Sequence, residues 1–380
     1  MKPPTGEEMV PLMRSLLERL GRRRGVRHVA LGACTLDGLW EWVGACGTAD
    51  RAGTPMGADT PWLIASVTKL YVAAVILRLH EAGRLRVDEP AVKYLPGEFL
   101  TGLHVLEGTD FTDEITAVQL LGHLSGLPDY LTEKPAGGQS LIDEVIAGPD
   151  LSWTPAGAVR RARDRLSPYF RPSAPGSTRP KIRYSDTNYQ LLVVMAEHVT
   201  GKPMATLYQE MLFEPLALGD TWLPGARSAG SVPAPATVWL GPRPFDDRPL
   251  ALASVGDLYS TTHDLLRFGR GLFEGEVFEH PRTLGLMSER FNRFGFPRRL
   301  SNVRAPSWPI EYGLGLMRFE LGRLLAGGLR LPPLMGHTGS TGSWLWYLPD
   351  HGALVAGTVD QATGAAVPFR AVPRALSSLT

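Results

Sequence analysis

The segment Ser66-Val-Thr-Lys-Leu-Tyr-Val-Ala-Ala-Val-Ile-Leu77 places a serine and a lysine, three residues apart, at the start of an apolar run. From Val67 to Ala82 the sequence is apolar on almost every side until Arg78, and Gly83 suits the position after a last helical turn. This pattern predicts a central, buried helix with Ser66 at its amino-terminal edge. Residues i and i+3 share a helix face, so the Lys69 ammonium can reach the Ser66 hydroxyl.

Lys69 is the residue that distinguishes a reactive pair from an ordinary helix start. In the simplest structural interpretation, Ser66 caps the helix and Lys69 is a solvated charge. An unpaired ammonium is costly at the start of a helix that is otherwise apolar all round, which argues against that interpretation. A helix amino terminus also supplies N–H groups and positive potential where an oxyanion forms. The motif therefore marks Ser66 as a candidate nucleophile.

The amino-terminal part of the chain predicts a helix over Glu7 to Arg23 followed by a β-hairpin. The two β-rich segments, His28 to Cys34 and Leu39 to Cys46, flank an Asp37-Gly38 turn. This register places Cys34 opposite Glu41 and Cys46 opposite Val29, so we expect the two cysteines not to form a disulfide.

The length of the whole chain predicts two lobes, because 380 residues with 44% apolar content exceed the size at which a single hydrophobic core stops growing. We assign residues 1–85 and 250–380 to an α/β lobe and residues 86–249 to a mostly helical lobe with Pro/Gly-rich loops near 133–138, 171–180 and 224–244. The predicted helices are Ala117 to Leu121, Gln190 to Thr200, Thr262 to Phe273 and Phe369 to Ser378, and the predicted strands are Tyr312 to Phe319, Ser343 to Tyr347 and Ala353 to Val359.

Two further segments carry candidate site residues. Tyr184-Ser-Asp-Thr-Asn188 precedes a helix, and a tyrosine near an ammonium can have its pKa lowered enough to act as a general base. Its structural alternative is a buried aromatic residue, with Asp186 or Thr187 capping the helix. Gly336-His-Thr-Gly-Ser-Thr-Gly342 leads into a strand, and its glycines allow close approach of a ligand to the backbone. A plain turn is the alternative there.

Taken in order, Ser66-x-x-Lys69, Tyr184-Ser-Asp186 and His337-Thr-Gly339 resemble the three motifs of serine β-lactamases, penicillin-binding proteins and their esterase and peptidase relatives. Further stretches that resemble the family are Gly122 to Tyr130, Leu258 to Phe268 and Tyr312 to Leu316. The resemblance implies an α/β (α+β) fold of the β-lactamase/transpeptidase type, in which an antiparallel sheet flanked by helices adjoins the helical lobe and the active site lies between them.

The resemblance also implies roles for individual residues. Ser66 would attack a carbonyl, Tyr184 with Lys69 would take its proton, and the N–H groups of Ser66 and Ser340 would hold the oxyanion. Asp186, His337, Thr338 and Gly339 would contact the substrate. His123 lies in a segment that looks structural in the family, so we expect no catalytic role for it.

Two departures from the family motifs bear on the substrate. Asp186 stands where β-lactamases have an asparagine that donates a hydrogen bond, and an ionised aspartate can only accept. His337 stands where they have a cationic lysine, and an ordinary histidine is largely neutral at pH 7. Both changes favour hydrolysis of small carboxylic esters. The alternatives are D-aminopeptidase, amidase or β-lactamase activity, acyl transfer to an alcohol and, from another class, a non-catalytic scaffold.

Composition restricts the partners. A formal net charge of +1 gives no field that would attract nucleic acid or a membrane, so a small ester or amide is the expected partner. The histidines and the two cysteines lack metal-ligand spacing, and we expect neither a metal nor a cofactor.

The most apolar run, Leu70 to Leu77, is too short to cross a bilayer, and the amino terminus lacks signal-peptide features, which predicts a cytoplasmic protein. The oligomeric state does not follow from the sequence.

Overall fold

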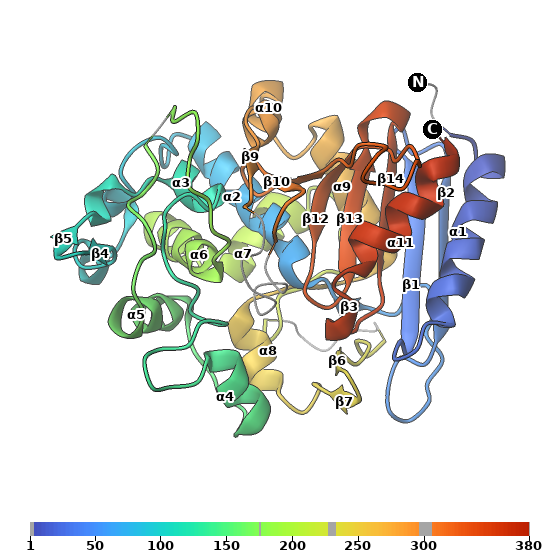
Figure 1. Cartoon of the computed structure of the whole chain (residues 1–380), viewed down its shortest axis with the longest axis horizontal. Coiled ribbons are helices and arrows are strands. Elements are labelled where there is room, and N and C mark those ends of the chain that lie inside the picture. Colours follow the sequence, from blue (N-terminus) through green and yellow to red (C-terminus); the bar gives the residue numbers. More distant parts are fainter. Residues whose placement is uncertain (1–3, 175, 227–232, 296–305, 380) are drawn as a thin grey trace.

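An eight-stranded antiparallel sheet lies beside a group of helices in the computed structural model, which describes residues 4–174, 176–226, 233–295 and 306–379 (Figure 1). In spatial order the strands are β2 (Glu41–Gly47), β1 (His28–Thr35), β14 (Ala353–Thr358), β13 (Ser343–Leu348), β12 (Leu334–Thr338), β11 (Met317–Phe319), β10 (Ile310–Tyr312) and β9 (Asn292–Arg293). The two ends of the chain therefore meet in one sheet. This confirms the predicted α/β arrangement of an antiparallel sheet flanked by helices beside a helical region.

The β1–β2 hairpin has the register predicted from its turn. Cys34 lies opposite Glu41 and Val29 lies opposite Cys46, and both cysteines are free thiols. Gly38 has φ +68°, a left-handed conformation that glycine adopts without steric cost. The turn chemistry therefore fixed which side chains of β1 face each side of the sheet.

Helices cover both faces of the sheet. Alternate residues of β1 face opposite ways, so that Val29 and Leu31 pack with α1 (Gly6–Gly21) and α11 (Val367–Leu376), while Ala30 packs on the side of α9 (Thr262–Glu274). Figure 1 shows α1 and α11 on one side of the sheet and α9 on the other. The helices predicted at both ends of the chain and near Thr262 are confirmed, with ends shifted by one to two residues.

The remaining elements surround the helical side. They are α3 (Ala117–Leu121), α4 (Leu141–Ala147), α5 (Pro155–Arg165), α6 (Asp186–Thr200), α7 (Met204–Tyr208), α8 (Pro249–Val255), α10 (Pro281–Ser288), the hairpins β4 (Val105–Leu106) with β5 (Thr109–Asp110) and β6 (Trp239–Leu240) with β7 (Arg243–Pro244), and the pair β3 (Trp62–Leu63) with β8 (Tyr259–Ser260). Of the predicted loops, residues 175 and 227–232 lie outside the described part.

Among the described residues, no helix has the length and apolarity to cross a membrane.

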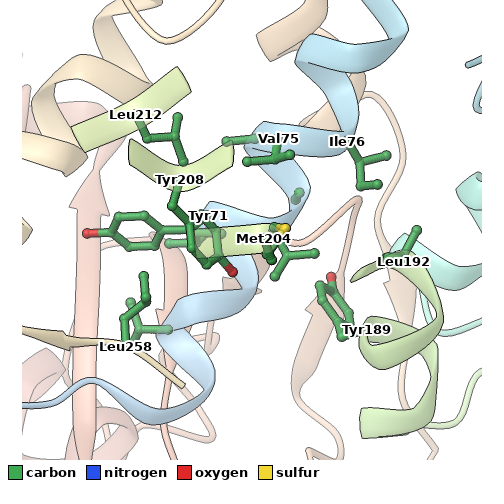
Figure 2. Packing of buried hydrophobic residues seen from close by; sticks show 14 of the residues in the cluster. Tyr71, Val75, Ile76, Tyr189, Leu192, Met204, Tyr208, Leu212 and Leu258 are labelled. Carbon is green, nitrogen blue, oxygen red and sulfur yellow. The ribbon is translucent and has the colours of Figure 1, made fainter. Parts of the chain in front are cut away.

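The central helix α2 (Thr68–Glu81) joins the two regions, as its apolar sequence predicted. Its buried side chains include Tyr71 and Ile76, which share one core cluster with Leu192 of α6 and Tyr208 of α7 (Figure 2). The same cluster includes sheet residues such as Leu345, so the sheet and the helices are stabilised by a continuous core. The lobe boundaries at residues 85 and 249 stay a prediction.

The single strand predicted over Tyr312 to Phe319 is wrong. The segment forms two short antiparallel strands, β10 and β11, joined by a turn in which the Gly313 N–H donates to the Leu316 carbonyl over 2.8 Å. Gly315 has φ +73°, and a Cβ there would lie 2.4 Å from the Cβ of Ala73 in α2. The glycines therefore allow the turn to lie against the central helix, which the prediction of one continuous strand did not include.

The shared core predicts a large cost for truncating Leu192. Leu192→Ala should lower the free energy of unfolding by about 2–5 kcal/mol, because a fully buried leucine leaves a cavity. Leu39→Ala is the matched control, since Leu39 is 87% exposed, and it should change stability by less than about 0.5 kcal/mol. Urea unfolding followed by circular dichroism measures both, and equal effects would contradict the assigned core.

Candidate active site

Ser66 lies in a strained turn at the start of α2. The 3-10 turn Ala65–Val67 leads into the helix, and Ser66 is partly exposed between buried neighbours. Ala65 has φ +49°, a conformation that costs a non-glycine residue roughly 1–3 kcal/mol and persists only where the surroundings impose it. The turn thus presents the Ser66 hydroxyl at the surface of an otherwise buried segment.

The sheet imposes this turn through the glycine-rich segment after β12. A Cβ on Gly339 would lie 2.7 Å from the Cβ of Ala65 and 2.9 Å from the Ile64 carbonyl oxygen. The Ser343 hydroxyl donates to the same Ile64 carbonyl over 2.8 Å. Close approach of a ligand to these glycines stays a prediction. In this structure Gly339 allows the turn Ala65–Val67 to lie directly against the end of β12.

Lys69 connects Ser66 to Asp186. Its Nζ lies 3.1 Å from Ser66 Oγ and 2.6 Å from Asp186 Oδ1, and its side chain is only 7% exposed. Burial lowers the pKa of the Lys69 ammonium, but the charges of Asp186, Tyr184 and Asp257 outweigh burial and hold that pKa well above its usual value. Lys69 is therefore a firmly charged ammonium in the resting site.

Tyr184 lies just before α6, with its ring 5.1 Å from Lys69 Nζ and its hydroxyl hydrogen-bonded to Lys69 and Ser66. We expected the ammonium to lower its pKa. Burial instead raises the pKa of Tyr184 above its usual value, although Lys69 acts in the opposite direction. Tyr184 is thus protonated at rest. Asp186 pairs with Lys69 and does not cap α6, and its own N–H donates to Asp129 Oδ2 over 2.7 Å.

His337 is fully buried and faces the interior. The Nδ1 donates to the Thr338 carbonyl over 2.8 Å, so Nε2 accepts a hydrogen bond from the Tyr312 hydroxyl, also over 2.8 Å. Burial, and then the Lys69 charge, lower the pKa of His337 to about 3, which keeps the ring neutral. The Thr338 side chain is also buried, whereas Ser340 is exposed. Both side chains expected to contact the substrate, those of His337 and Thr338, are thus buried in this structure, and their substrate contacts stay a prediction.

Two carboxylates around the Lys69–Asp186 pair, Asp129 beside Asp186 and Asp257 acting on both, were not singled out from the sequence. Burial and the nearby Asp186 raise the pKa of Asp129 to about 6. Burial also raises the pKa of Asp257 to about 7, with Lys69 lowering and Asp186 raising it. Asp257 directly precedes Leu258, whose carbonyl accepts the Ile64 N–H over 2.9 Å. Asp129 lay in a stretch quoted for its family resemblance, but no local pattern indicated its contact with Asp186.

No group of three or more histidine, cysteine, aspartate or glutamate side chains that could hold a metal ion occurs in the described ranges. The side chains that the site itself offers are a serine, a lysine, a tyrosine and carboxylates. A partly exposed serine beside a buried lysine and a partly buried tyrosine can attack a carbonyl carbon and carry an acyl group.

Comparison with known proteins identifies the family. A family model described as Beta-lactamase matches residues 13–377. The chain belongs to the β-lactamase family. Esterase EstB of Burkholderia gladioli is 34% identical over 177 residues, which are 46% of this chain and 42% of EstB. The D-alanyl-D-alanine-carboxypeptidase/endopeptidase AmpH of Escherichia coli K12 is 25% identical over 296 residues, 76% of this chain and 67% of AmpH.

A solved structure matches this β-lactamase family member over nearly its whole length. The D-stereospecific amidohydrolase from a Streptomyces species superposes with a TM-score of 0.71 and 27% identity, covering 95% of this chain and 97% of that protein. The esterase, the carboxypeptidase and the amidohydrolase are all hydrolases, which supports classing the chain as a serine hydrolase.

The ion pair predicts the effect of Asp186→Asn on pH dependence. Removing the carboxylate removes a charge that raises the pKa of Lys69, so the ammonium should lose its proton at lower pH. We expect the alkaline limb of the rate of Ser66 labelling by a fluorophosphonate to move down by about 1–2 pH units. Glu289→Gln, an exposed change on the segment after α10, serves as the control. An unmoved alkaline limb would show that Asp186 does not set the charge of Lys69.

Proposed function

We propose that this protein hydrolyses small carboxylic esters through an acyl-enzyme on Ser66. The proposal rests on the state of Lys69 and His337, the two motif residues that could pair with a substrate carboxylate. Lys69 is paired with Asp186, and His337 is neutral and buried. Substrates such as β-lactams and cell-wall peptides present a carboxylate that would find no counter-charge from either residue, whereas an ester of an uncharged acid needs none.

In the proposed reaction the Ser66 Oγ attacks the ester carbonyl, and the N–H groups of Ser66 and Ser340 stabilise the oxyanion. Collapse of this intermediate releases the alcohol and leaves the acyl group on Ser66. Water then attacks the acyl-enzyme and releases the acid. Acyl transfer would follow the same course with an alcohol in place of water. A cytoplasmic location stays a prediction.

The proton of Ser66 has two acceptors within reach, and both begin protonated. Tyr184 can relay it, accepting the serine proton while its own hydroxyl proton passes to the departing ester oxygen, so that the tyrosine is neutral before and after the step and Lys69 stabilises the partial negative charge on its oxygen. Alternatively, Lys69 passes a proton to Asp186 and then accepts the serine proton as a neutral amine, over the contacts of 2.6 and 3.1 Å. We favour the tyrosine, because its hydroxyl contacts both Ser66 and Lys69.

Substrate panels and intact-protein mass spectrometry test this function. The wild-type protein should hydrolyse p-nitrophenyl butyrate with a kcat/KM at least about 100-fold above that for nitrocefin, a difference of roughly 2.7 kcal/mol. A butyryl adduct should appear on the wild type and be lost in Ser66→Ala, with ester turnover falling about 10³-fold or more. Ser152→Ala, which removes an exposed serine, is the control. Nitrocefin turnover as fast as that of the ester would refute the substrate assignment.

Hydrolysis of amino-acid amides is a second candidate, favoured by the charge around Lys69. Asp129, Asp186 and Asp257 all act on one another or on this single ammonium, so the site carries more carboxylates than it pairs. A substrate ammonium group would meet a favourable field. The similarity to the D-stereospecific amidohydrolase from Streptomyces supports the same alternative.

Asp257→Asn distinguishes the two candidates. Removing this charge should lower kcat/KM for D-phenylalanine amide by about tenfold if the substrate ammonium is attracted to it, since each partly buried charge contact contributes roughly 1–2 kcal/mol. Hydrolysis of the uncharged p-nitrophenyl butyrate should change much less. Both rates are measured at about pH 7.5, above the pKa of Asp257 of about 7 and below the α-amino pKa of about 7.7–8.0, so that the carboxylate and the substrate ammonium are both largely charged. Equal changes for both substrates would exclude Asp257 from ammonium recognition.

A further inference from the structure

His123 follows α3 in the interior of the molecule, beside the residues of the candidate site. It is completely buried and has φ +57°, a left-handed conformation uncommon for histidine. Its ring lies 4.2 Å, centroid to centroid, from the ring of Tyr184 and 4.6 Å from that of Tyr312. None of the chemical steps proposed above uses this residue.

The backbone on both sides of Tyr184 is bound to His123. The Arg183 N–H donates to the His123 carbonyl over 3.0 Å, and the Ser185 N–H donates to His123 Nδ1 over 3.2 Å. The Asn188 side-chain amide also donates to Nδ1, over 3.1 Å. One residue thus fixes the peptide groups before and after the tyrosine and packs against its ring.

These contacts define the protonation state of His123. Two N–H donors converge on Nδ1, so Nδ1 must be the unprotonated nitrogen and the hydrogen of the neutral ring lies on Nε2. A proton on Nδ1 would face both donors and break both hydrogen bonds. Burial, followed by the charge of Lys69, holds the pKa of His123 well below its usual value, which maintains the accepting form.

We infer that His123 is a positioning residue that holds the Tyr184 hydroxyl against Ser66 and Lys69 by accepting hydrogen bonds at Nδ1. The inference rests on the proposed acyl-enzyme of Ser66 but not on the choice between ester and amide substrates. It assigns the buried histidine a function in the reaction through the tyrosine that it fixes, without contact with the substrate.

Two matched substitutions test the position of the acceptor. The Oδ1 of His123→Asn can occupy the place of Nδ1, and asparagine tolerates a positive φ. His123→Gln carries the same amide one bond further out, near the place of Nε2. The rate constant for fluorophosphonate labelling of Ser66 should stay within about fivefold of wild type for the asparagine variant and fall about 30-fold or more for the glutamine variant. With p-nitrophenyl butyrate the glutamine loss should appear in kcat, with KM within about threefold.

A double-mutant cycle shows whether the effect passes through the tyrosine. In a Tyr184→Phe background, His123→Gln should reduce labelling by less than about threefold further, because residues that act as a unit give non-additive losses. If the glutamine variant does not fold, His123→Gly, which tolerates the positive φ and lacks the acceptor, takes its place with the same expectation.

The inference is overturned if the asparagine and glutamine variants lose labelling equally, or if the two losses multiply in the double variant. Failure of the substrate proposal is distinguishable, because it leaves labelling of the wild type and of the asparagine variant intact while ester turnover is absent. Absence of labelling in the wild type would refute both.

Discussion

One buried ammonium determines how this site is built. Lys69 lies in the first turn of a helix whose side chains are all buried from Leu70 to Leu77, and taking its charge out of water is costly unless a counter-charge is close. Asp186 supplies that charge from the first turn of α6, at 2.6 Å. The rings of Tyr184 and Tyr189 also face the ammonium, at 5.1 and 5.2 Å from their centroids. Pairing the lysine therefore draws the start of α6 to the start of α2.

Close backbone contacts from the sheet also fix the position of the start of α2. Gly315 lies against α2 from the β10–β11 turn, and Gly339 lies against Ala65 from the end of β12. A side chain at either glycine would push the sheet away from the helix. The strained conformation of Ala65 is held by these contacts, so the position of Ser66 depends on the packing of the sheet against α2 as well as on the helix.

Features set by local chemistry were predictable from the sequence. The Asp37-Gly38 turn gave the hairpin register, the apolar run gave α2, and the i,i+3 spacing brought Ser66 to Lys69. Features set by burial were not. The direction of the pKa shift of Tyr184 follows from a desolvation that only the folded chain creates. In the same way, the approach of Asp257 to Lys69 depends on a loop conformation that no residue pattern encodes.

Substrate charge and pH are linked at this site. Below about pH 6, Asp129 and Asp257 are both largely protonated, and the pair of Lys69 with Asp186 leaves the site close to neutral. Above about pH 7 both carboxylates ionise, and the site gains negative charge that only a cationic ligand relieves. The raised pKa values also mean that these two ionisations oppose folding, because the folded state binds protons more tightly than the unfolded chain; the stability they cost grows from about pH 4 to about pH 7 and is constant above that range. A bound ammonium would offset that electrostatic cost, whereas a neutral ester would leave it unchanged. A cationic substrate should therefore stabilise the folded protein more above about pH 7 than below about pH 6, and an uncharged ester should stabilise it equally at both.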